Sequence, residues 1–96
     1  SWQLHRRLST LLNHDSFNEW RPRIERNMDR LRDGVTGQPH VRNLQRWRVL
    51  VDRGELPGLH RVLTGLDRDS IEMREVSPMS GLLPDEQRRE ILQLAG

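Results

Sequence analysis

Three arginines along the predicted helix 39–53 are the strongest candidates for chemistry in the sequence. Arg42, Arg46 and Arg53 are spaced i, i+4 and i+11, which a period of about 3.6 residues places on one side of the helix. A guanidinium group presents paired N–H donors that match the oxygen atoms of a phosphate. The row therefore predicts contacts with a nucleic-acid backbone.

Two polar residues of the same helix extend this candidate interface. His40 at the start of the helix and Gln45 could add polar contacts, and residues 34–51 contain no acid. Asp52 beside Arg53 weakens the row. The alternative interpretation is the solvated outer face of an amphipathic helix, which carries charged residues whether or not it binds anything.

A second candidate site is apolar and lies in the stretch "SPMSGLL". Met79, Leu82 and Leu83 follow a proline and surround a glycine between two acidic helices. If they are exposed, they predict a protein-docking site, because methionine adapts to the shape of a partner. The alternative is that they pack the last helix onto the core, since so short a chain needs every apolar residue there.

The segment 59–78 partly matches the pattern of a helix-turn-helix. Gly65 has the position of the turn glycine, but Arg61 stands four residues earlier, where a small residue is usual. The second helix carries several carboxylates, which would repel a DNA backbone. If DNA is bound, helix 39–53 is therefore the better candidate.

No motif in the sequence indicates catalysis, a cofactor or a metal. The four histidines show neither HxxxH nor HExxH spacing, and there is no phosphate-binding or dinucleotide-binding glycine motif. Ser77 and Ser80 lie in a turn, but nothing in the sequence identifies a base for them. We therefore expect a protein that is not an enzyme and that binds no cofactor or metal.

The composition favours helices. Leucine, isoleucine, valine and phenylalanine number 25 of 96 residues, and 15 of the 25 are leucine. β-Branched and aromatic residues are few, which disfavours strands. The length allows one core. We predict an all-α fold, in which residues 1–96 form a single-domain bundle of about five short helices.

Glycines and prolines divide the chain into helical pieces. The expected ranges are 2–12, 14–34, 39–53, 56–65, 67–76, with Asp67 or Asp69 as its N-cap, and 83–94, with Pro84 at its start. Gly54 is the expected end of the third piece.

The second piece shows the clearest periodicity, with intervals of 3, 4, 4 and 3 between apolar residues. These residues are Phe17, Trp20, Ile24, Met28 and Leu31. Ser16 and Glu19 match a capping box, yet Pro22 disfavours a regular helix through that point. Of a kinked helix capped by Ser16 and a regular helix that begins near Arg21, we favour the second.

The other pieces also present apolar stripes. In helix 39–53, Trp47 shares a side with Leu44 and Val51 and is predicted to be a core residue. The remaining predicted core positions include Leu4, Leu8, Leu11, Leu12, Leu59, Val62, Leu63, Leu66, Leu83, Ile91 and Leu94.

Arginine supplies all 16 basic residues, and the net charge is +2. Residues 1–50 carry ten arginines and five acids, for a charge of +5, whereas residues 51–96 carry six and nine, for −3. On helix 14–34, spacing predicts ion pairs Glu19–Arg23, Asp29–Arg32 and Arg30–Asp33, which would neutralise most of its outer face. The asymmetry indicates either an anionic partner or attraction between the halves, within a chain or between chains.

These features favour a non-catalytic interaction or regulatory module that binds a protein partner, possibly itself. The alternative function is nucleic-acid binding by the basic half of the chain. No apolar run approaches the length of a membrane span, so we expect no membrane partner. The absence of cysteine fits a reducing compartment, and a cytoplasmic location is expected.

Overall fold

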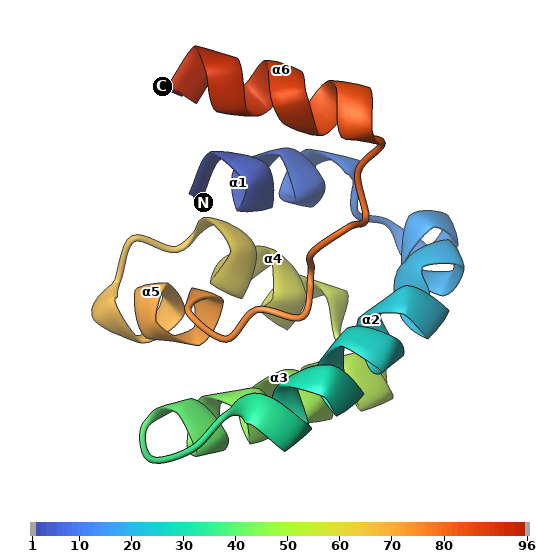
Figure 1. Cartoon of the computed structure of the whole chain (residues 1–96). Coiled ribbons are helices and arrows are strands. Elements are labelled where there is room, and N and C mark those ends of the chain that lie inside the picture. The colour runs from blue at the N-terminus through green and yellow to red at the C-terminus, as the bar shows by residue number, and fades with distance from the viewer. Residues whose placement is uncertain (1, 96) are drawn as a thin grey trace.

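Six α-helices account for most of residues 2–95, the part of the chain that the computed structural model describes (Figure 1). They are α1 (Trp2–Leu11), α2 (His14–Gly34), α3 (His40–Arg53), α4 (Leu56–Thr64), α5 (Arg68–Arg74) and α6 (Asp85–Ala95). This part contains no strand, so the all-α prediction is confirmed. Its six helices correspond to the six expected ranges and slightly exceed the expected number of about five. None of the six combines the length and apolar character needed to cross a bilayer.

The start of α2 differs from the favoured prediction. Asn13 caps the helix: its Oδ1 accepts from the N–H of Ser16 at 2.9 Å, and Ser16 Oγ accepts from the N–H of Asn13 at 2.9 Å. This reciprocal cap fixes the helix start at His14. The helix continues through Pro22, so a start near Arg21 is wrong. Pro22 leaves the Asn18 carbonyl without its helical donor, and Asn18 is exposed, so water can replace the donor.

The other helix ends largely follow the sequence signals. Gln38 Oε1 accepts from the N–H of Arg42 at 3.0 Å in the first turn of α3, and Gly54 ends α3 with φ of 59°. Asp67 caps α5, where its side chain accepts from the N–H of Ser70 at 3.1 Å. One of the two predicted caps for α5 is therefore confirmed.

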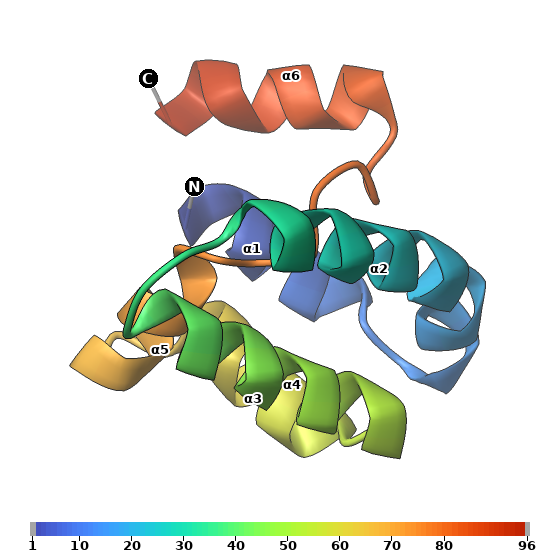
Figure 2. The same cartoon turned by 60° about the horizontal axis from the view of Figure 1, so that its bottom comes forward.

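Trp47 lies at the centre of the core. Its side chain is fully buried, and its indole Nε1–H donates to the carbonyl oxygen of Met73 at 2.7 Å. This bond joins α3 to α5, and Figure 2 shows α3 running alongside α2, with α4 and α5 behind it. The prediction that Trp47 is a core residue is confirmed.

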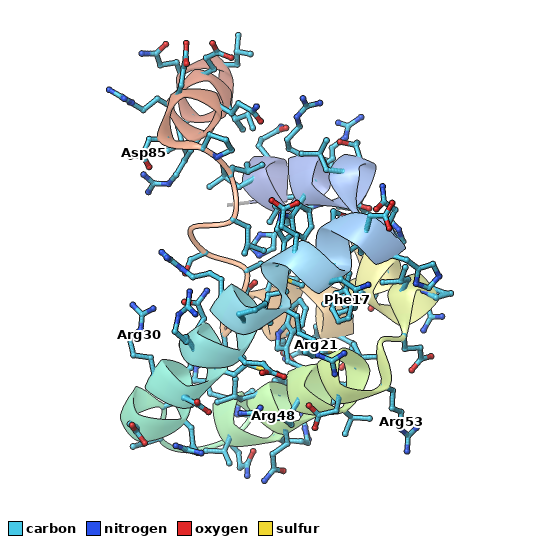
Figure 3. The ribbon with its side chains drawn as sticks, turned by 90° about the vertical axis from the view of Figure 1, so that its right-hand side faces the viewer. Phe17, Arg21, Arg30, Arg48, Arg53 and Asp85 are labelled. Atoms are coloured by element: carbon cyan, nitrogen blue, oxygen red, sulfur yellow. The ribbon has the colours of Figure 1, made fainter. Side chains whose placement is uncertain are left out.

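The buried cluster includes most of the predicted stripes. Its members are Leu8, Leu12, Phe17, Ile24, Met28, Leu44, Trp47, Val51, Leu59, Val62, Leu63, Met73, Val76, Met79 and Leu83. Arg21 reinforces the contact between α2 and α3: its Nη2 donates to the carbonyl oxygens of Val51 and Asp52 at 3.1 and 3.2 Å (Figure 3). These carbonyls belong to the last turn of α3, where a cation is favourable.

Two predicted core leucines are exposed. Leu66 is 73% exposed because it follows the last turn of α4 and no longer obeys the helical period. Leu94 is 90% exposed in the last turn of α6. Both predictions were wrong because the apolar stripe was continued past the last residue against which a neighbouring element packs.

Helix α6 lies outside the core. Residues 84–90 are all exposed, and Ile91 is the one side chain of residues 85–94 that packs, partly buried, against the core cluster. The helix lies beside α1 and stands apart from α2 to α5 (Figures 1 and 3). Five helices therefore form the packed body, and the sixth is attached to its surface.

We expect Trp47→Phe to lower the free energy of unfolding by about 2 kcal/mol, because it removes a buried hydrogen bond and leaves a small cavity. Trp20→Phe is the control, since Trp20 is half-buried and its ring nitrogen makes no hydrogen bond within residues 2–95; it should cost less than about 1 kcal/mol. Urea denaturation followed by circular dichroism measures both. Equal costs would contradict the central position of Trp47.

Candidate functional site

The arginine row of α3 is interrupted at its middle member. Arg46 forms a bidentate ion pair with Asp69 of α5, with Nη1–Oδ1 and Nη2–Oδ2 distances of 2.6 and 2.5 Å. Its Nη1 also contacts Oδ1 of the buried Asn43 at 3.3 Å. Arg42 and Arg53 are exposed, and Figure 3 shows Arg53 projecting into solvent at the end of α3. The three arginines lie on one side of α3, but the guanidinium of Arg46 is already paired with the carboxylate of Asp69.

The pair affects the ionisation of both partners. The hydrogen bond from Arg46 lowers the pKa of Asp69, and the carboxylate in turn raises the pKa of Arg46. The pKa of Asp67 is lowered as well, by hydrogen bonds from Ser70. The end of α5 beside α3 therefore keeps its carboxylates charged, which disfavours a phosphate at this position.

The two polar residues predicted with the row lie in different surroundings. His40 is half-buried, and its Nδ1 is buried without a hydrogen-bond partner within residues 2–95. Gln45 is exposed at a groove of about 190 Å³ between α2 and α3, whose wall is largely apolar and includes Val41 and Leu44. The structure does not bring His40, Gln45 and the arginines together around one ligand position.

The apolar stretch after α5 belongs to the core. Met79 and Leu83 are 3% and 8% exposed, and Leu82 is partly buried against the same cluster. A partner cannot reach Met79 or Leu83 in this conformation, so the predicted docking site at these residues is not supported. The alternative interpretation in the sequence analysis explains this burial: so short a chain has few apolar residues, and the core includes those of this loop.

The helix pair considered as a helix-turn-helix is α4 and α5. Gly65 lies in the turn, where a Cβ atom would come within 2.4 Å of Ser70 Oγ. The close packing explains the glycine. However, Asp69 of the second helix contacts Arg46 of α3, so this helix presents a carboxylate where a DNA reader needs donors.

The outer face of α2 is more positive than spacing predicted. Of the three expected ion pairs, Asp29–Arg32 is present at 3.7 Å. Arg30 instead donates to Asn27 Oδ1 at 2.8 Å, and the guanidinium of Arg23 lies over Gly81. Neither Arg23, Arg26 nor Arg30 makes an ion pair within residues 2–95.

Two serine–histidine contacts join distant segments. Ser9 Oγ lies 2.8 Å from Nδ1 of His60, and His5 Nε2 lies 2.7 Å from Ser77 Oγ. The histidine beside Ser77 could not be predicted from sequence spacing, because the two residues are 72 positions apart. Ser77 Oγ also accepts from the N–H of Met79 at 3.2 Å. Both contacts hold α1 against the rest of the fold.

The part of the chain that the structure describes contains no group of three or more histidine, aspartate or glutamate side chains arranged to hold a metal ion. Comparison with protein-family models, with curated proteins and with solved structures found no match to this chain.

The lowered pKa of Asp69 makes stability depend on pH. A carboxylate with a depressed folded-state pKa stabilises the fold above its unfolded pKa of about 3.9, and this contribution is lost as the pH falls through the folded value. We expect Asp69→Asn to destabilise the protein at pH 7 by at most about 1 kcal/mol, because the pair is half-exposed.

The same variant should lose less stability than the parent between about pH 5 and pH 2, since it lacks one group that becomes protonated there. Urea denaturation at several pH values measures this difference. Asp52→Asn is the control, because Asp52 is exposed on α3 and its carboxylate makes no ion pair within residues 2–95. Parallel pH profiles for the parent and Asp69→Asn would show that the Arg46 pair contributes nothing.

Proposed function

We propose that this chain is a non-catalytic interaction module whose partner is a second copy of itself, and that the copies meet through α1 and α6. A groove of about 280 Å³ lies between these helices and is lined by Gln3, Arg6, Arg7, Thr10, Ile91 and Leu94. Leu94 is almost fully exposed at its edge. This exposed leucine beside an open groove is the observation that carries the proposal.

Helix α1 carries unpaired cations and one edge of α6 carries unpaired carboxylates, while Arg88 and Arg89 lie at other positions around α6. Helix α1 contains Arg6 and Arg7 and no acid. Glu90 and Glu86 lie four and eight residues before Leu94, which places them along the same edge of α6. None of these four charged side chains makes an ion pair within residues 2–95. A neighbouring copy can supply the missing opposite charge.

A two-fold arrangement uses these features reciprocally. Leu94 of each copy enters the groove of the other, and Glu90 then lies against Arg7 of the facing α1. Arg6 is held over the ring of Trp2, with its Cζ atom 5.3 Å from the ring centroid. The stacked pair adds a tryptophan and an arginine, residue types that often dominate interface energies.

Nucleic-acid binding by α3 is the less favoured function. It requires Arg42, Arg46 and Arg53 to contact phosphates together, and Arg46 is bound to Asp69. Releasing it would leave that carboxylate facing the nucleic acid. The alternative therefore has support from composition and little from the arrangement of side chains.

We expect sedimentation of the full chain to show a concentration-dependent shift from one chain to two. Leu94→Glu should abolish the dimer, because it places a carboxylate in an apolar contact. Leu66→Glu is the matched control, since Leu66 is also exposed but lies between α4 and α5. A monomer at all concentrations, or loss of the dimer in Leu66→Glu alone, would contradict the proposal.

A charge exchange tests the pairing itself. Arg7→Glu should weaken the dimer about tenfold or more, because it places a carboxylate opposite Glu90 of the other copy at both symmetry-related contacts. The double variant with Arg7→Glu and Glu90→Arg should recover most of the affinity. If the double variant is as weak as the single one, these residues do not face each other.

A further inference from the structure

A cavity that is open to solvent, separate from the α1–α6 groove, lies between the second half of α2 and the loop before α6. Its volume is about 390 Å³. Asn27, Arg30, Ser77 and Ser80 form its polar wall, and Leu31 and Val35 are among its apolar residues. No acidic residue lines it. An uncompensated guanidinium beside two hydroxyl groups is a suitable environment for an anion.

Asn27 holds this wall in place. It is 3% exposed, and its Nδ2 donates to the carbonyl oxygens of Pro78 and Ser80, both at 2.8 Å. Its Oδ1 accepts from Arg30 Nη2 at 2.8 Å. One buried amide therefore fixes both the loop with the serines and the arginine opposite, so the donors need little reorganisation to bind a ligand.

The hydroxyl groups of Ser77 and Ser80 can each donate a hydrogen bond to a ligand in the cavity. Ser80 is exposed, and its hydroxyl makes no hydrogen bond within residues 2–95. Ser77 Oγ accepts from the N–H of Met79 and lies 2.7 Å from His5 Nε2. When His5 donates from Nε2, the Ser77 hydroxyl proton is free to point to the cavity.

The surroundings add positive potential. Arg26 and Arg23 occupy the same outer face of α2 as Arg30, one and two turns earlier, and make no ion pair within residues 2–95. The guanidinium of Arg23 lies over Gly81, directly after Ser80. The wall of the site therefore contains no carboxylate, and cations flank it toward the first half of α2. The neighbouring Asp29 and Asp33 of α2 are each paired with Arg32.

We propose that this cavity binds a phosphomonoester group. A terminal phosphate carries close to two negative charges and three oxygen acceptors, which match one guanidinium and two hydroxyls arranged around a concavity. A nucleic-acid backbone would instead need a row of separate contacts to successive phosphates. The phosphate can belong to a small molecule or to a phosphorylated side chain, because both present the same group.

The test is a titration of the ¹⁵N-labelled full chain with sodium phosphate, followed by amide chemical shifts, against sodium chloride at equal ionic strength. We expect saturable shifts at Ser77, Ser80 and Gly81 with phosphate alone. Arg30→Gln should weaken binding about tenfold or more. Arg26→Gln removes the same charge one turn away, outside the cavity wall, and should weaken it less than about twofold.

A phosphoserine peptide and its unphosphorylated form identify the source of the group: tighter binding of the phosphopeptide than of free phosphate indicates a protein ligand, and equal binding indicates a small molecule. Ser80→Ala provides a second variant that leaves the fold intact, because the hydroxyl is exposed and unbonded; it should also weaken binding.

Three results would overturn the proposal. They are shifts that chloride reproduces, equal loss in Arg30→Gln and Arg26→Gln, and duplex DNA binding that displaces phosphate and depends equally on both arginines. The last result would assign the face of α2 to a nucleic-acid backbone instead.

Discussion

The hydrogen bond from the Trp47 indole to the Met73 carbonyl determines how α5 sits on α3. Because this bond is buried in the centre of the core, α5 cannot slide along α3 without leaving a polar group unsatisfied. Asp69 lies one turn before Met73 on α5, and Arg46 precedes Trp47 on α3. Because Trp47 and Met73 are held together, their neighbours Arg46 and Asp69 are brought into contact. The ion pair that interrupts the arginine row is therefore a consequence of the core packing.

The parts of the fold that depend on local spacing could be predicted from the sequence. The stripe of α2 and the buried side of α3 follow helical periodicity, and Gly54 and Asp67 act as the caps expected of them. The course of α2 through Pro22 could not be predicted, because a cap at Asn13 outweighs the missing N–H of one exposed proline.

The candidate sites were predicted less well, because they depend on contacts between distant residues. Spacing placed three arginines on one side of α3 but could not show Asp69, 23 residues away, bound to the middle one. Likewise, spacing predicts an ion pair between Arg30 and Asp33, whereas the Arg30 guanidinium donates to Asn27. Asn27 in turn binds a loop more than 50 residues further along the chain. The loop after α5 joins these results: Met79 and Leu83 anchor it in the core, Asn27 clamps it to α2, and it leads to α6 on the surface. The proposed phosphate site lies on this loop, and the α1–α6 groove lies beyond it, at the C-terminal turns of the helix to which the loop leads.

Hydrogen exchange at the three indole N–H groups tests the central position of Trp47 most directly. In ¹⁵N-labelled protein transferred to D₂O, the Trp47 signal should persist long after those of Trp2 and Trp20 have disappeared, with an exchange rate that follows global unfolding as urea is added. Trp2 lies in the first turn of α1 and Trp20 is half-buried, so local opening suffices for both. Disappearance of all three signals at similar early times would show that Trp47 is not enclosed and that α5 is not fixed to α3.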